Sequence, residues 1–236
     1  EKDSYKELID RADSALYRAK FLRRNSVEIY SSIFEELNTL ESHNQVLQET
    51  FHSLKTLITV INSRDAYTFN HIERVVYLCK VVANHLHLSA DEKKRLIYAA
   101  YLHDLGKINI SKEILISDQK LTQQQWEELK QHPAESAEII KKVEGFQDIV
   151  PIVLQHHERY DGTGYPNHLK GNQICYLARI LVLADSFDAM TSKRPYQPIK
   201  SYEEAFAEIR KCSGTQFDPS LCEPFIEAIE SIKENE

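Results

Sequence analysis

Five of the ten histidines in this 236-residue chain lie in motifs that can bind a metal ion. These motifs are His71, His103 with Asp104 after it, His132, and the adjacent pair His156 and His157. Asp185 follows the apolar run 180–184, where burying a carboxylate is costly unless it is paired or binds a cation. Each residue alone is more often structural, but packing does not easily explain all of them together. Mixed imidazole and carboxylate ligands favour Fe, Mn or Zn over Ca or Mg.

Other kinds of catalytic site are missing from the sequence. There is no GxxxxGK[ST] or GxGxxG loop for ATP-type phosphate binding, and no GxSxG nucleophile elbow. His157 and Glu158 begin like the HExxH motif of zinc proteases, but residue 161 is Asp. Metal-assisted chemistry is therefore the class of reaction that the motifs favour.

Composition limits the partners of the chain. With 29 basic and 36 acidic residues the net charge is −7, which argues against a broad DNA-, RNA- or anionic-membrane-binding surface. A small phosphate ligand stays possible because a bound metal supplies its own positive charge. No apolar run approaches the roughly 18 residues of a membrane span, so we expect no membrane contact.

The four cysteines form no CxxC pair, which predicts free thiols in a reducing cytoplasm. Since the first residue is Glu rather than Met, we expect the sequence to be a piece of a longer protein. The parent protein can carry a membrane anchor upstream.

Helices are expected to position the histidines, because six Gly and seven Pro are too few for a turn-rich β fold. The spacing of apolar residues predicts helices over 71–88 and 91–105, the second capped by Ser89 and Glu92 and stopped by Gly106. Further helices are predicted after Thr122, from Pro133, and over 148–158, 174–192, 201–212 and 219–233. No segment alternates long enough for a convincing strand. The predicted fold class is all-α.

The N-terminal part contains a heptad repeat over residues 30–61. Its a and d positions are apolar except for Asn44, and a lone Asn at an a position tends to fix register and strand number. This pattern predicts a signalling helix that forms a parallel homodimer. The alternative is a long helix that packs on its own domain.

The catalytic part resembles a known family. Residues 103–108, HDLGKI, resemble the core of the HD-superfamily phosphohydrolases, and residues 156–166, HHERYDGTGYP, resemble the signature of the HD-GYP subfamily. The likeness continues in 64–71, 178–196 and 214–219, and it covers about 62–236. Residues 12–20 resemble the closing helix of GGDEF domains, the diguanylate cyclases. The expected organisation is a GGDEF remnant over 1–24, a coiled-coil helix over 25–61 and an HD-GYP domain over 62–236.

The resemblance implies an all-α phosphodiesterase that hydrolyses cyclic di-GMP at a cluster of divalent metals, with Fe or Mn the expected ions. One metal would be held by His71, His103, Asp104 and Asp185. The second would be held by Asp104, His132, His156 and His157, so that Asp104 bridges the two. Some members have a Glu that helps to bind a third metal at the position where this chain has Tyr67. This difference favours a site with two metals. Hydrolysis can stop at the linear dinucleotide or continue to GMP.

Other residues are expected to act on the substrate. Lys107 can stabilise the charged transition state or orient the phosphate, and its alternative is a solvated lysine beyond a helix end. Arg194 offers a planar fork to the second phosphate, and Asp188, one turn after Asp185, can support a ligand histidine or contact a guanine edge. The remaining candidates for substrate binding are Gly164, Tyr165, Pro166 and Arg179. The loop 161–166 is also compatible with a simple tight turn.

Three departures from the family pattern concern substrate affinity more than chemistry. Gln197 stands where many members have a basic residue, Asn70 and Ser136 where Gly is usual. We expect Gln197→Arg to lower the Michaelis constant more than it raises turnover. Two alternative functions stay open, a cyclic dinucleotide receptor with little turnover and a hydrolase of another cyclic dinucleotide.

Overall fold

The computed structural model describes residues 66–115, 117, 119–192 and 199–234. The predicted coiled coil, the GGDEF-like stretch, Arg194 and Gln197 lie outside these residues. Within them the chain contains helices and no strand, with one isolated bridge between Ser213 and Phe217, so the all-α prediction is confirmed. None of the helices in this part is both long and apolar enough to cross a bilayer.

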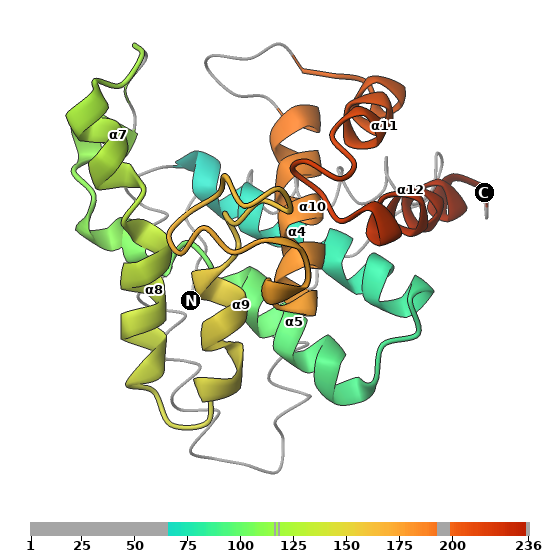
Figure 1. Cartoon of the computed structure of the whole chain (residues 1–236), viewed down its shortest axis with the longest axis horizontal. Helices are drawn as coiled ribbons and strands as arrows, with labels where there is room; N and C mark the ends of the chain where they lie inside the picture. Colours follow the sequence, from blue (N-terminus) through green and yellow to red (C-terminus); the bar gives the residue numbers. More distant parts are fainter. Residues whose placement is uncertain (1–65, 116, 118, 193–198, 235–236) are drawn as a thin grey trace, which may run out of the picture.

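Helix α10 (Tyr176–Thr191) runs through the middle of the molecule (Figure 1). It packs against α4 (Ala66–His85), α5 (Ala90–Leu102) and α9 (Val150–Leu154) and also against α11 (Tyr202–Lys211) and α12 (Pro219–Glu234). Phe187 of α10 is fully buried, and its ring stacks on Phe206 of α11 at 5.6 Å. This packing fixes α10 against the C-terminal helices.

A second group of helices lies between α5 and α9 in the chain. It contains η1 (Leu105–Asn109), α6 (Lys112–Leu115), α7 (Gln123–Leu129), α8 (His132–Lys141) and η2 (Gln147–Ile149). Helix α8 packs on both η1 and α9, whereas α7 lies at the periphery in Figure 1 and buries none of its residues. A long loop that contains η3 (Gly171–Gln173) joins α9 to α10.

The predicted helix starts agree well with the structure. Ser89 and Thr122 cap α5 and α7 through complete capping boxes, and Pro133 lies in the first turn of α8. Side-chain oxygens there satisfy backbone N–H groups that have no partner inside the helix. Both C-terminal helices also form close to their predicted bounds.

Two predicted helix ends beside the histidine motifs were wrong. Helix α5 ends at Leu102 rather than at Gly106, which lies inside η1. A Cβ at Gly106 would come within 2.3 Å of the His132 carbonyl oxygen, so this glycine allows two backbones to touch and does not stop a helix. The helix predicted over 148–158 is shorter, since α9 ends at Leu154; His156 and His157 therefore lie on turns.

Candidate metal centre

The first cluster consists of His71, His103 and Asp185, which come from α4, the end of α5 and α10. One potential ligand atom from each residue lies within 4.8 Å of the others. The His71 Nε2 atom is 3.3 Å from the Asp185 Oδ1 atom, and both histidines are buried. Two consecutive helices, α4 and α5, and the distant α10 therefore bring a set of mixed nitrogen and oxygen donors together.

The second cluster consists of His132, His156 and His157, again with ligand atoms within 4.8 Å of one another. His132 begins α8, and the adjacent pair follows α9. The Nε2 atoms of His132 and His156 are 3.2 Å apart. All three donors are imidazole nitrogens, so this cluster carries no carboxylate of its own.

Asp104 lies between the two clusters. Its Oδ2 atom is 3.4 Å from His103 Nε2 and 3.9 Å from His71 Nε2, while its Oδ1 atom is 3.4 Å from His132 Nε2. Each carboxylate oxygen thus faces a different cluster. This is the geometry that a bridging carboxylate needs.

Three of the histidines are oriented by backbone carbonyls. The Nδ1 atoms of His103, His132 and His156 each contact the carbonyl oxygen three residues earlier, at Ala100, Leu129 and Val153, over 2.7, 2.7 and 2.6 Å. A carbonyl only accepts, so Nδ1 carries the proton and donates it. Each Nε2 is then left with a lone pair that faces the interior, as in metal-binding histidines.

The donor set fits a cation. Burial lowers the pKa of His132 to about 3 and the pKa of His157 to about 4, and it also holds the pKa of His156 well below the usual value. These imidazoles are therefore neutral at pH 7, and the lone pairs of His132 and His156 face each other at 3.2 Å with no proton between them. A positive ion between such lone pairs removes their repulsion.

Asp188 supports His71 from behind. Its carboxylate accepts a 2.7 Å hydrogen bond from His71 Nδ1 and is also paired with Arg74 and Ser192. Burial alone would raise the pKa of Asp188, but the hydrogen bond from His71 and the ion pair with Arg74 bring it well below its usual value. Since Asp188 is completely buried, the geometry supports its role towards His71 rather than contact with a guanine edge.

Lys107 forms an ion pair with Asp104, with Nζ 2.7 Å from Oδ2. Burial raises the pKa of Asp104, but Lys107 and the nearby imidazoles together lower it well below its usual value. The Lys107 side chain is 25% exposed, so it lies where the buried cluster meets the surface. This contact contradicts the alternative of a solvated lysine.

Comparison with known proteins identifies the family. Residues 55–221 match the model of the family described as HD domain. The chain belongs to the HD domain family. It is 39% identical over 184 residues to a cyclic di-GMP phosphodiesterase of Thermotoga maritima, covering 77% of this chain and 50% of the relative. It is 38% identical over 186 residues to the cyclic di-GMP phosphodiesterase response regulator RpfG of Xanthomonas campestris. The match covers 78% of this chain and 49% of that relative.

A third relative of this HD domain has a different substrate in its name. It is the 3'3'-cGAMP-specific phosphodiesterase 3 of Vibrio cholerae, 34% identical over 160 residues, which cover 68% of this chain and 35% of the relative. The chain spans about half the length, or less, of these curated relatives.

Solved structures agree on the fold of the HD domain. The protein Bd1817 of Bdellovibrio bacteriovorus superposes with a TM-score of 0.57 at 20% identity, over 86% of this chain and 67% of that one. The V-cGAP3 phosphodiesterase of V. cholerae superposes with a TM-score of 0.52 at 22% identity, over 70% of this chain and 44% of that one. At this identity the likeness concerns the fold alone.

The loop after His157 folds back over its own beginning. The Tyr165 ring stacks on the His157 ring at 5.0 Å, and the Tyr165 N–H donates to the His157 carbonyl. A Cβ at Gly164 would lie 2.3 Å from the Arg159 nitrogen, so this position requires glycine. Burial raises the pKa of Tyr165, which keeps its phenol protonated. The tight-turn interpretation of the loop is confirmed, with Pro166 following through a cis peptide bond.

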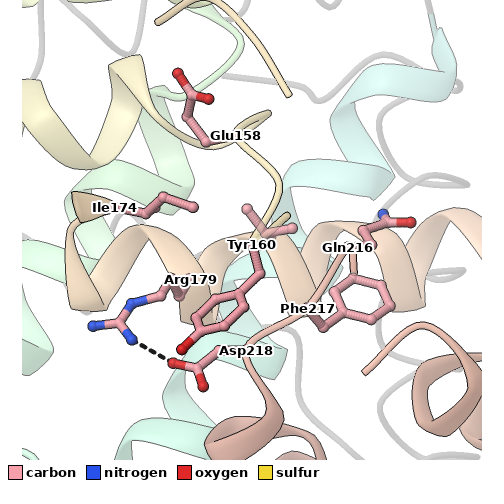
Figure 2. Close-up of a pocket in the computed structure, with 8 residues that line it drawn as sticks. Glu158, Tyr160, Ile174, Arg179, Gln216, Phe217 and Asp218 are labelled. Atoms are coloured by element: carbon pink, nitrogen blue, oxygen red, sulfur yellow. Dashed lines mark hydrogen bonds and ion pairs between the residues drawn. The ribbon is translucent and has the colours of Figure 1, made fainter. Parts of the chain in front are cut away.

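Arg179 lies in a different place from the clusters. It pairs with the buried Asp218 and donates to Asn172, and its guanidinium lies 5.3 Å from the centre of the Tyr176 ring. Figure 2 shows this ion pair at a small pocket whose lining includes none of the seven His and Asp residues described above. Because Asp218 already neutralises Arg179, the expected contact of Arg179 with substrate finds no support in this arrangement.

Three residues of the site escaped the sequence analysis as functional candidates. Arg74 holds Asp188, and its position three residues after His71 on the same helix face was the available signal. Glu158 is buried and accepts hydrogen bonds from the backbone of Asn167 and Leu169. Ser136 was treated only as a departure from the family pattern, although it contacts the His103–Asp104 turn.

Proposed function

We propose that this HD domain is a metal-dependent phosphodiesterase that hydrolyses cyclic di-GMP. The observation that carries the proposal is the position of Asp104, which faces two separate groups of buried metal-binding side chains with its two oxygens. The names of the relatives from T. maritima and X. campestris supply the substrate.

The proposed ligands are seven. His71, His103 and Asp185 would hold one ion, His132, His156 and His157 the other, and Asp104 both. The mixture of imidazole and carboxylate suits Fe or Mn. When bound, a pair of divalent cations activates water for in-line attack on phosphorus and neutralises the phosphate charge.

The residues of the chain itself would divide the remaining work. Lys107, at the exposed edge of the cluster, would bring its ammonium to the phosphate, where negative charge develops during the reaction. The outer hydrogen bonds of His71, His103, His132 and His156 would keep each Nε2 aimed at the metal centre. Arg194 would bind the second phosphate, and the 164–166 loop would border the substrate beside His157.

One experiment tests this function directly. The protein would be purified without oxygen, its Fe and Mn content measured, and its products from cyclic di-GMP separated by chromatography. We expect two metal ions per chain and either the linear dinucleotide or GMP. Binding of cyclic di-GMP without turnover, in protein loaded with either metal, would contradict the proposal and favour a receptor.

A second candidate substrate is 3'3'-cGAMP, favoured by the name of the V. cholerae relative. Competition between equal concentrations of the two cyclic dinucleotides would separate the two activities. We expect cyclic di-GMP to be consumed first.

The assembly is also a proposal. We propose that residues 30–61 form a parallel homodimer, that 1–24 are the end of a GGDEF domain, and that the chain is cytoplasmic. Four free thiols support a reducing compartment. Light scattering at micromolar concentration should give a dimer, and removal of residues 1–61 should give a monomer; a monomeric full chain would contradict the coiled coil.

A further inference from the structure

The segment between α11 and α12 contacts the loop that follows His157. The Tyr160 N–H donates a 3.2 Å hydrogen bond to the Gln216 carbonyl, and the Asp161 N–H donates a 2.8 Å hydrogen bond to the Thr215 carbonyl. Backbone hydrogen bonds therefore join two stretches that lie far apart in the sequence. They hold the beginning of the loop whose later part stacks on the His157 ring.

The side chain of Gln216 extends this contact in two directions. Its Oε1 atom accepts a 3.2 Å hydrogen bond from the Arg159 guanidinium, which also pairs with Asp161 inside the loop. Its Nε2 atom donates a 3.2 Å hydrogen bond to the Ser186 hydroxyl of α10. One amide group therefore connects the loop to the helix that carries Asp185.

The same segment is fixed to α10 a second time. Asp218 is buried and pairs with Arg179, which lies two turns before Ser186 and therefore on the same face of α10. The small pocket in Figure 2 lies where the loop, α10 and this segment meet, since residues of all three line it. Because this ion pair does not involve Gln216, a change at Gln216 can release the loop without detaching the segment from α10.

We propose that Gln216 is a positioning residue that holds the 159–165 loop against His157 and thereby sets the affinity for the cyclic dinucleotide. The inference rests on the proposed function, in which this loop borders the substrate. A loop released from Gln216 spends part of its time in other conformations, and substrate binding must then order it. The apparent affinity falls in proportion to the fraction of chains with an ordered loop, whereas the rate of the chemical step in the bound state stays the same.

Steady-state hydrolysis of cyclic di-GMP at saturating Mn²⁺ tests this role. Gln216→Met fills a similar space without hydrogen bonds, and we expect it to raise KM about tenfold with kcat unchanged, the effect of losing one or two hydrogen bonds. Gln216→Glu should restore the wild-type KM, because one carboxylate oxygen accepts from Arg159 and the other accepts from the Ser186 hydroxyl. If Gln216 only stabilised the fold, Gln216→Met would lower the melting temperature and leave KM unchanged.

Gln147→Met serves as the matched control. The Gln147 side chain also joins two groups, since it accepts from the Gly145 N–H and donates to the Val143 carbonyl in the turn between α8 and η2. The variant therefore undergoes the same chemical change and loses two hydrogen bonds in another part of the fold. We expect the wild-type KM and kcat in Gln147→Met.

Hydrogen exchange of the loop amides gives a second readout that needs no activity. The N–H groups of Asp161 and Tyr165 are both hydrogen-bonded, and they should exchange about tenfold faster in Gln216→Met than in the wild type. In Gln147→Met they should exchange at the wild-type rate. Unchanged exchange in Gln216→Met, or an unchanged KM in an active chain, would overturn the inference.

The affinity readout separates this inference from the proposed function. A wild-type chain that binds cyclic di-GMP without turnover would contradict the function alone. The dissociation constant then takes the place of KM, and the same rise in Gln216→Met would support the inference. A wild-type chain that neither binds nor hydrolyses either of the two cyclic dinucleotides would overturn both.

Discussion

His71 and His156 are both buried imidazoles of the metal centre, but their outer hydrogen bonds span very different lengths of chain. His156 donates to a carbonyl three residues before it, whereas His71 donates to Asp188, 117 residues away. The second cluster is therefore oriented largely by turns at the ends of α8 and α9. The first cluster depends on the packing of α4 against α10, which brings Asp188 and Arg74 together.

The two clusters also differ in charge. Asp185 gives the first cluster a carboxylate, and Asp188 lies directly behind it. The second cluster contains three neutral imidazoles whose pKa values are depressed by burial. A cluster of imidazoles competes with protons for its metal, while a carboxylate adds direct attraction for the cation. The difference predicts that the two halves respond differently to mutation and to pH.

The largest effect is expected from Asp104, which both clusters share. Asp104→Ala should lower hydrolysis of cyclic di-GMP by at least about 10³-fold, because both ions lose the ligand that they share. Metal content and turnover should be measured together, with circular dichroism to check the fold. Substantial activity in this variant would show that the clusters work independently.

A change at Lys107 removes the ion pair with Asp104 without removing a proposed metal ligand. Lys107→Ala should lower turnover by about 10²-fold, as loss of one group that stabilises transition-state charge does, with metal content unchanged. The exposed Lys112 offers a control, since Lys112→Ala should behave like the wild type. Wild-type turnover in Lys107→Ala would limit Lys107 to pairing with Asp104.

Asp188→Asn should affect one cluster selectively. Loss of the carboxylate behind His71 is expected to lower the affinity of the first cluster for its ion by about 10- to 100-fold. The second cluster keeps the local hydrogen bonds that orient its histidines. Calorimetric titration with Mn²⁺ would resolve the two ions. The exposed Asp148 provides the control Asp148→Asn. An equal loss of affinity for both ions would contradict the distinction between the clusters.

A separate expectation is a pH dependence of the stability of the metal-free protein. The pKa of His132 is lowered to about 3 and the pKa of His157 to about 4, so the unfolded chain takes up protons first as pH falls below about 6.5. Stability is therefore full above that pH and should decrease towards pH 4, by up to about 1.4 kcal/mol per pH unit for each histidine.

Denaturant unfolding at pH 7.5, 6 and 5 would measure this loss. His157→Asn removes one titrating group and should make the decrease shallower. A free energy of unfolding that is equal at the three pH values would contradict the assignment of neutral, buried imidazoles to the second cluster.

The amino-acid sequence by itself determined the helical class, the capped starts of α5 and α7, and the identity of the His and Asp residues in the two clusters. These features depend on local spacing: a capping box involves residues three apart, and the His103–Asp104 and His156–His157 pairs are adjacent. Local hydrogen bonds leave a pattern in the sequence because both partners lie within one turn.

Only the tertiary structure decided how the supports around the clusters are paired. Arg74 and Asp188 are 114 residues apart, and Arg179 is neutralised by Asp218 from the loop before α12, so neither pairing could be inferred from spacing. Gly106 resembled a helix stop in the sequence. The position requires glycine because the backbone of α8, 26 residues or more away along the chain, leaves no room for a Cβ. Such contacts follow from how whole helices pack, and packing depends on many side chains at once rather than on any one motif.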